Sequence, residues 1–356
     1  MKKILLQVPS VHLSKNNVFK QDVNSQSEAR IILKEDLKKL GYDFTTADNH
    51  SLNDCAWILY LDTLSLDGIY LQQDGVKARA RALLGLKTPR PWPNRPLYQE
   101  AIKAGLQDRM ALILWECKAV NPQNYNTEVW RKFKYIFTWD DDLVDNKKFF
   151  KFYHPFSHKA SPKNIPPFNQ KKLLVNMSGS KTSTEPNELY SARLKTIEYF
   201  TNKYPNDFDL YGGPWNVPRN RMQRTFPWLV KKYKSNRGES MDKIETLSKY
   251  KFTVCYENME KVKGWVTEKI FDALTARSVP IYWGAENIEE FVDADTFIDR
   301  RKFKNNEELA NYLFSVTEEK YNEYLTAGER YLQSEKFKKF LPENFSKTII
   351  ETLGIK

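Results

Sequence analysis

The sequence predicts an α/β protein with two Rossmann-like domains that face a central crevice, followed by C-terminal helices. Three observations lead to this fold class. A chain of 356 residues is long enough for two ordinary domains. Short apolar runs alternate with stretches of helical spacing, which is typical of parallel βαβ units. A proline-rich stretch without periodicity, residues 155–172, separates two such halves.

These features set the expected domain bounds. We expect an N-terminal Rossmann-like domain over residues 1–160 and a C-terminal Rossmann-like domain over residues 161–335. A helical tail follows over residues 336–356, and the region from Leu309 onward predicts two or three helices in all.

The N-terminal half contains one amphipathic helix and four apolar runs of strand length. The helix, Glu28–Leu40, has apolar residues at helical spacing and ends before Gly41, a common C-terminal signal. The apolar runs fit strands of a parallel sheet. They are Lys3–Val8, Ala56–Leu61, Met110–Trp115 and Tyr135–Trp139.

The C-terminal half repeats this alternation. Strands are expected at Leu173–Met177 and Asp207–Tyr211, with the helix Glu188–Phe200 between them. Residues 250–284 then read as a strand, a helix and a second strand, the last being Val279–Trp283. Such a unit has a right-handed crossover and a parallel sheet.

Polar residues follow the first strand of this last unit. Lys251–Tyr256 ends at Glu257 and Asn258, and Thr267 suits the N-cap of the helix that follows. Ligands of such sheets bind at the carboxyl ends of the strands, where free helix N–H groups favour an anion. Lys269 in the first helical turn fits a phosphate, although a solvated lysine beside a structural carboxylate explains the spacing equally well.

Composition limits the class of protein. The formal net charge of +11 favours an acidic partner, which could be a nucleoside diphosphate, an anionic lipid surface or nucleic acid. Cys55, Cys117 and Cys255 are scattered and lack metal-ligand spacing, so we expect no disulfide framework and a reducing compartment. No apolar run suits a signal peptide or a membrane span, which predicts a soluble protein.

The segments CYEN, WVTEKIFDAL and VPIYWG together resemble the donor-site signature of the alpha-1,3-fucosyltransferases of glycosyltransferase family 10, especially the bacterial type. The resemblance is dense over about 35 residues. It implies a GT-B type fold and an inverting transfer of L-fucose from GDP-fucose to a glycan hydroxyl. The donor would bind the C-terminal domain and the acceptor the N-terminal domain.

The same resemblance assigns the donor contacts. An arginine on the helix after the first strand of the C-terminal domain would bind the diphosphate, with a nearby lysine offsetting charge on the departing GDP. A glutamate and an asparagine at the strand end, and a second glutamate, would contact ribose or sugar hydroxyls. A tryptophan takes the usual place of a tyrosine, which keeps stacking but changes the phenol contact. The predicted donor-binding residues are Arg193, Glu257, Asn258, Trp265, Thr267, Glu268 and Lys269.

Glu116 is the predicted catalytic base. An inverting transfer needs a group that removes the proton of the acceptor hydroxyl as it attacks the anomeric carbon. Glu116 directly follows the strand Met110–Trp115, and LWECKAVNP loosely resembles the family's strand-end motif with its catalytic glutamate. The alternative is a carboxylate that caps a helix or pairs with Lys118.

Several alternatives stay open. Asp140–Asp142 imitates the DxD metal motif of another glycosyltransferase fold, but a solvated turn explains it better. We therefore expect no metal ligands and no tightly bound cofactor; stimulation by Mn²⁺ or Mg²⁺ is compatible with this but not required. Another GDP-sugar is the alternative donor. Nucleic-acid binding is the alternative class, disfavoured because no RNP, zinc-finger or helix-turn-helix pattern is present.

The acceptor is the least defined partner. The resemblance favours N-acetylglucosamine in a bacterial surface polysaccharide such as lipopolysaccharide. We expect its site on the N-terminal half, where the resemblance is weakest, with Arg79, Arg81 and the loop near Trp92 as candidate contacts. Family members of the Golgi carry a membrane anchor that is absent here, so we expect a bacterial cytoplasmic enzyme. Peripheral contact with the inner membrane would use the tail, where Phe337 and Phe340 lie among lysines, although a solvated helix end explains this segment better.

Overall fold

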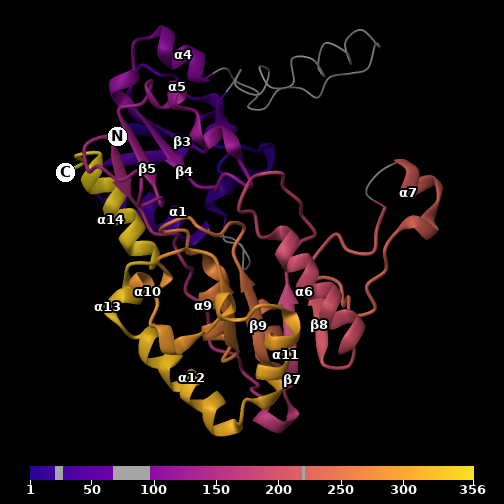
Figure 1. The fold of residues 1–356 in the computed structure, drawn as a ribbon. Helices are drawn as coiled ribbons and strands as arrows, with labels where there is room; N and C mark the ends of the chain where they lie inside the picture. Colours follow the sequence, from indigo (N-terminus) through magenta and orange to yellow (C-terminus); the bar gives the residue numbers. More distant parts are fainter. Residues whose placement is uncertain (21–26, 67–96, 219–220) are drawn as a thin grey trace. The chain divides into compact units, whose positions relative to one another are not determined.

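The computed structural model describes residues 1–20, 27–66, 97–218 and 221–356, and the chain divides into two compact units (Figure 1). Unit 1 comprises Met1–Ser157 together with Phe340–Lys356, and unit 2 comprises His158–Lys339. The division falls inside the proline-rich stretch. The last 17 residues belong to unit 1, whereas the sequence analysis treated residues 336–356 as a separate tail.

Unit 1 is built on a six-stranded parallel sheet with the order β2-β1-β3-β4-β5-β6. The four predicted strands are present. The sequence analysis missed two edge strands because β2 mixes polar and apolar residues and β6 has only three residues. The strands are β1 (Lys2–Gln7), β2 (Tyr42–Thr46), β3 (Cys55–Leu61), β4 (Met110–Leu114), β5 (Tyr135–Thr138) and β6 (Phe149–Lys151).

The helices of unit 1 come from both ends of the chain. The predicted helix is α1 (Ser27–Lys39), and the C-terminal helix α14 (Pro342–Thr352) lies beside it (Figure 1). Ser346 donates a hydrogen bond of 2.8 Å to Asp36 of α1, and Phe345 packs edge-on against Trp115. The remaining α-helices in the described part of unit 1 are α4 (Leu97–Lys103) and α5 (Thr127–Trp130).

Unit 2 has a five-stranded parallel sheet with the order β11-β10-β9-β7-β8. All four predicted strands are present, and the two-residue strand β11 is added at the edge. The strands are β7 (Lys172–Met177), β8 (Phe208–Tyr211), β9 (Tyr250–Tyr256), β10 (Val279–Trp283) and β11 (Ile298–Asp299).

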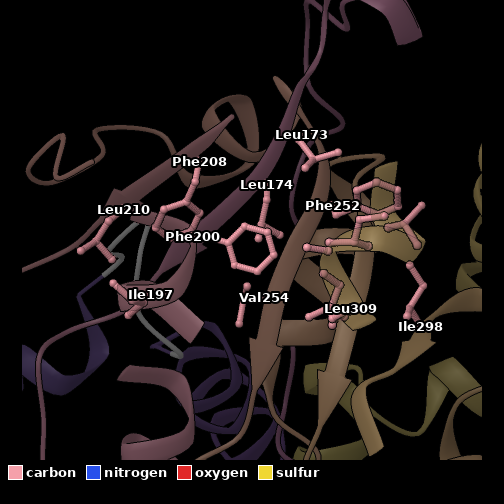
Figure 2. Packing of buried hydrophobic residues seen from close by; sticks show 14 of the residues in the cluster. Leu173, Leu174, Ile197, Phe200, Phe208, Leu210, Phe252, Val254, Ile298 and Leu309 are labelled. Carbon is pink, nitrogen blue, oxygen red and sulfur yellow. The ribbon is translucent and has the colours of Figure 1, made fainter. Parts of the chain in front are cut away.

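Helices of unit 2 cover the sheet and its core. Phe200 of a helix packs on Phe208 of β8, with ring centroids 5.9 Å apart, and Leu174 and Val254 lie beside them (Figure 2). The helices are α6 (Tyr190–Lys203), α7 (Arg221–Thr225), α8 (Lys243–Leu247), α9 (Glu268–Thr275), α10 (Ile288–Phe291), α11 (Asn306–Ser315), α12 (Glu318–Leu332) and α13 (Glu335–Lys338).

The region from Leu309 therefore contains four helices, α11 to α14, where two or three were predicted. It also differs in exposure. Phe337 is 8% exposed and Phe340 1% exposed, since both rings pack into the protein. Because both rings are buried, they are not exposed for contact with a membrane surface, which the neighbouring lysines had suggested. None of the helices in the described ranges has the length and apolarity needed to cross a bilayer.

Both sheets share one topological feature that places a binding site. In each, the first strand of the unit lies between the second and third, so the chain reverses its direction of progress across the sheet. The reversal occurs between β1 and β3 in unit 1 and between β7 and β9 in unit 2. Ligands of open parallel sheets bind at the carboxyl ends of the strands at this switch point.

The C-terminal helix gives a first testable prediction. Phe345→Ala removes a ring that is 2% exposed and contacts Trp115 and Phe152, so it should destabilise unit 1 by about 3 kcal/mol. Hydrogen exchange followed by peptide is the measurement, with faster exchange expected in β4. Lys347→Ala, on the exposed face of α14, is the control. Unchanged exchange in β4 would contradict a structural role for α14.

Candidate functional site

A cationic pocket of about 170 Å³ lies at the switch point of unit 2. Its walls come from the loop after β7, the first turns of α6 and part of the chain after β8, namely residues 215–217, 223, 230, 231 and 233. Lys181, Arg193 and Lys231 line it, and none of its described lining residues is acidic. Lys231 also pairs with Glu198 outside the lining, whereas Lys181 is exposed. The pocket therefore suits an anionic ligand.

Arg193 links the pocket to the end of β9. It is 6% exposed, and its Nη2 donates hydrogen bonds of 2.5 Å to the carbonyl oxygen of Tyr256 and 2.9 Å to that of Glu257. Burial lowers the pKa of Arg193, and the charge of Glu257 opposes this effect. The guanidinium is thus fixed by the backbone across the switch point while it lines the pocket. The sequence analysis placed this residue at the site by resemblance.

The loop after β7 was not recognised from the sequence as part of the site. It carries Ser180 and Lys181 and lies at the carboxyl end of the first strand of unit 2. Its position after a strand at the switch point is the signal that could have identified it. A Cβ on Gly212 would lie 2.5 Å from the carbonyl oxygen of Ser178, and the φ of Gly212 is +106°. Gly212 is therefore needed for the close packing of its turn against the loop after β7.

Glu257 is the centre of a buried polar cluster at the end of β9. The side chain is fully buried, and one oxygen accepts hydrogen bonds of 2.9 Å from the backbone N–H and from the hydroxyl of Thr267. The other oxygen accepts from Lys269 Nζ at 3.0 Å. A Cβ on Gly284 would lie 2.5 Å from Glu257, so glycine is needed beside it. The carboxylate makes these internal contacts, and its contact with a ribose or sugar hydroxyl stays a prediction.

Thr267 and Lys269 serve the same cluster. Thr267 occupies the N-cap position of α9, as predicted, but its side chain bonds Glu257 instead of a helix N–H group. Burial lowers the pKa of Lys269, yet the charges of Glu257 and Glu268 outweigh this and raise it overall. Lys269 therefore stays protonated, with its charge largely offset by two carboxylates.

The other predicted donor contacts occupy different environments. Asn258 lies directly after Glu257, is half-buried, and its carbonyl accepts from Leu189 N–H at 3.0 Å. Glu268 opens α9 and its side chain is 32% exposed, 3.7 Å from Lys269. Trp265 is 2% exposed, so its indole face is not available for stacking on a base. The indole of Trp265, which is larger than the tyrosine ring expected from the resemblance, is buried within unit 2.

The structure explains an unusual pair before β10. Arg277 and Ser278 stand directly before Val279, the first residue of β10. Arg277 has a φ of +54°, a left-handed conformation that glycine adopts without strain. Its carbonyl accepts hydrogen bonds of 2.9 Å from both Lys171 and Tyr321, which hold the conformation. Ser278 is fully buried and its hydroxyl lies 2.7 Å from that of Thr253.

Glu116 lies in unit 1, just beyond the end of β4, and is half-buried. Its backbone N–H donates a hydrogen bond of 3.1 Å to Asp62, the residue that follows β3. Its carbonyl accepts from Asn124 Nδ2 at 2.8 Å. Asp62 and Asn124 were not predicted. The signal for Asp62 was available, since it follows β3 as Glu116 follows β4 and adjacent parallel strands end at the same edge.

The acidic segment Asp140–Asp142 behaves as a turn. Asp140 accepts a hydrogen bond from Asp142 N–H at 3.1 Å, and Asp141 pairs with Lys151 at 2.6 Å. Among the described residues, no group of three or more His, Cys, Asp or Glu side chains is placed to hold a metal ion. The candidate acceptor contacts Arg79, Arg81 and Trp92 lie outside the described residues. All three cysteines are free and buried.

The second half of the chain is similar to known proteins. Residues 181–347 match the model of glycosyltransferase family 10 (fucosyltransferase), C-terminal region. Alpha-(1,3)-fucosyltransferase FucT of Helicobacter pylori is 37% identical over 121 residues, covering 31% of this chain and 24% of that protein. Alpha-(1,4)-fucosyltransferase of Arabidopsis thaliana is 44% identical over 80 residues, covering 22% of this chain and 20% of that protein. The matches thus span about a quarter or less of these relatives.

Solved structures agree on the fold. An alpha1,3-fucosyltransferase in complex with GDP-fucose has a TM-score of 0.53 at 14% identity, covering 99% of this chain and 90% of that chain. HepE of Anabaena, in complex with UDP and glucose, has a TM-score of 0.52 at 12% identity, covering 99% of this chain and all of that chain. The predicted fold class, two Rossmann-like domains of GT-B type, is confirmed; the crevice between them stays a prediction.

The Glu257 cluster can be tested through stability. Lys269→Met leaves a fully buried carboxylate without its cation, so unit 2 should lose about 3 kcal/mol of unfolding free energy. The double variant Glu257→Gln with Lys269→Met should lose less than the sum of the single variants, because no buried charge remains. Urea unfolding of all three variants is the measurement. Strictly additive losses would show that the two side chains are not coupled.

Proposed function

Because the chain carries the C-terminal region of glycosyltransferase family 10, we propose that it transfers L-fucose from GDP-fucose to a hydroxyl group of a glycan. We further propose inversion at the anomeric carbon and an alpha-1,3 linkage to N-acetylglucosamine of a bacterial surface polysaccharide. The observation that carries the proposal is the cationic pocket at the unit 2 switch point, into which Arg193 is fixed.

The donor half of the proposal rests on charge. The bond from the anomeric carbon to the diphosphate breaks with its electron pair leaving on GDP, so negative charge grows on phosphate oxygens. Arg193 and Lys181 present positive charge in a pocket without described acidic lining residues. A guanidinium can donate two parallel hydrogen bonds to phosphate oxygens. Lys269 contributes less directly, since Glu257 and Glu268 already offset it.

The acceptor half rests on Glu116. We propose that its carboxylate takes the proton of the attacking hydroxyl while the new bond forms at the anomeric carbon. The backbone of Glu116 is held at both its N–H and its carbonyl, which supports a fixed geometry. No metal ion is needed for this step, because cationic side chains of the pocket can stabilise the departing diphosphate.

A related GDP-sugar is the alternative donor, since the phosphate-binding residues would be the same. The distinguishing measurement is mass spectrometry of products after incubation with a panel of GDP-sugars and glycan acceptors. We expect fucosylated product from GDP-fucose. A preference for a different GDP-sugar would replace fucose in the proposal, and a thermal shift with oligonucleotides but none with GDP would favour nucleic-acid binding.

Arg193 gives the sharpest test of donor binding. Arg193→Ala should weaken GDP binding by about 10- to 100-fold in calorimetry, because hydrogen bonds to a charged group are lost. Lys195→Ala removes the same charge from the exposed face of the same helix and should bind GDP as the unmodified protein does. Circular dichroism verifies that both variants are folded. Equal affinities of the two variants for GDP would contradict the proposed site.

A Glu116 variant distinguishes an effect on catalysis from an effect on GDP binding. Glu116→Gln should lower kcat by about 10²- to 10⁴-fold while the Kd for GDP stays unchanged, because the amide cannot accept the proton. Glu128→Gln is the matched control, since Glu128 lies in the same unit with a side chain 71% exposed. Initial rates with GDP-fucose and calorimetry with GDP are the measurements. A Glu116→Gln variant with undiminished kcat would remove Glu116 from the mechanism.

A further inference from the structure

Asp62 is a buried carboxylate at the carboxyl end of β3, beside the switch point of unit 1. It has no role in the proposed reaction as described above. It directly follows β3, is 3% exposed, and has a φ of +60°. A left-handed φ is uncommon for a residue other than glycine, and surrounding contacts must hold it. Of the described residues, no Lys or Arg forms an ion pair with Asp62.

The contacts of Asp62 converge on the backbone of Glu116. Its Oδ1 accepts hydrogen bonds from Trp115 N–H at 2.8 Å, from Glu116 N–H at 3.1 Å and from Asn124 Nδ2 at 2.5 Å. Asn124 Nδ2 uses its second proton on the carbonyl of Glu116 at 2.8 Å. The N–H and C=O groups of Glu116 are thus held by two side chains that also bond to each other.

Asn124 is itself fixed, which makes the arrangement stiff. Its Oδ1 accepts from the backbone N–H of Thr63 at 3.0 Å, from the Thr63 hydroxyl at 2.9 Å and from Asn121 Nδ2 at 2.9 Å. Asn121 and Asn124 are both buried. A buried network in which each side chain makes several hydrogen bonds holds one geometry, because breaking a bond leaves a polar group without a partner.

The titratable groups nearest to Asp62 are acidic or neutral side chains. Burial chiefly, and then the charge of Glu116, raise the pKa of Asp62 to about 7. The other titratable groups that face the network are Cys117 and Tyr125, the latter bonded to Asp140 at 3.4 Å. Across Trp115 lie Arg30, 5.8 Å from the indole centroid, and His154, 5.1 Å from it.

We propose that Asp62 is a positioning residue for Glu116: it fixes the Glu116 backbone and, when ionised, adds a negative charge that makes the Glu116 carboxylate a stronger base. This inference rests on the proposed role of Glu116. The acceptor proton moves to Glu116 alone, and Asp62 exchanges no proton with substrate. A like charge nearby disfavours the ionised carboxylate, which is why it strengthens the base.

The test compares Asp62→Asn with the unmodified protein. Asparagine keeps an oxygen for the three hydrogen bonds but carries no charge, so backbone positioning survives while the electrostatic effect is lost. The pH profile of kcat/KM should lose the ionisation near pH 7, and kcat above pH 7 should fall about tenfold with little change in KM. Because the two carboxyls titrate as a coupled pair, the profile reports the pair and not single residues.

Asp54→Asn is the matched control, since Asp54 is exposed and precedes the same strand β3 at its other end. It should leave both kcat and the pH profile unchanged. An Asp62→Asn variant that keeps the ionisation near pH 7 and a kcat within twofold of the unmodified protein would overturn the inference. Absence of fucose transfer by the unmodified protein would instead overturn the proposed function, and the role of Asp62 with it.

A second measurement does not depend on catalysis or on the folding of the Asp62 variant. A carboxyl whose pKa is raised in the folded state stabilises the fold below its unfolded pKa of about 4, and this stability is lost as pH rises to about 7. Urea unfolding across that range should show this contribution as a difference in pH dependence between the unmodified protein and Glu116→Gln. In Glu116→Gln the pKa of Asp62 should be raised less, because the charge of Glu116 is gone. The loss of stability should therefore be complete at a lower pH than in the unmodified protein. An identical pH dependence in Glu116→Gln would show that the two carboxyls do not interact.

Discussion

The organisation of unit 2 depends on one buried carboxylate, that of Glu257. A fully buried charge is tolerated only when it is paired and hydrogen-bonded. Glu257 meets this condition through Thr267 and Lys269, which lie at the start of α9. The contact joins the end of β9 to the helix that follows it, and the carbonyl of the same residue accepts from Arg193. Strand, helix and pocket are thereby fixed relative to each other.

This arrangement changes how the signature residues are understood. Several of them were expected to touch the donor, yet Glu257, Thr267 and Trp265 are buried and contact other parts of the protein. Thr267 bonds Glu257 at the start of α9, and the carbonyl of Glu257 accepts a hydrogen bond from Arg193, which lines the pocket. A sequence signature records which residue types are needed, and it does not separate residues that bind from residues that support.

In unit 1, a buried carboxylate also holds a later segment at the end of a strand, but an asparagine accompanies it in place of a lysine. At its switch edge Asp62 and Asn124 hold the backbone of Glu116, in the way that Glu257 holds α9 in unit 2. In both units a buried acidic side chain at a strand end accepts backbone N–H groups of a later segment. Parallel sheets make this recurrent, since neighbouring strands end at the same edge and their loops need hydrogen-bond partners.

The sequence by itself determined the two parallel sheets, all eight predicted strands and the positions of Arg193 and Glu116 at strand or helix ends. The strands follow from periodicity, which acts over a few residues, whereas Arg193 was assigned by resemblance to a known family and Glu116 by its place after a strand. Only the tertiary structure decided which polar side chains are buried and that α14 packs on α1. Burial and pairing depend on residues distant in the chain, such as Ser346 and Asp36, and no local pattern encodes them.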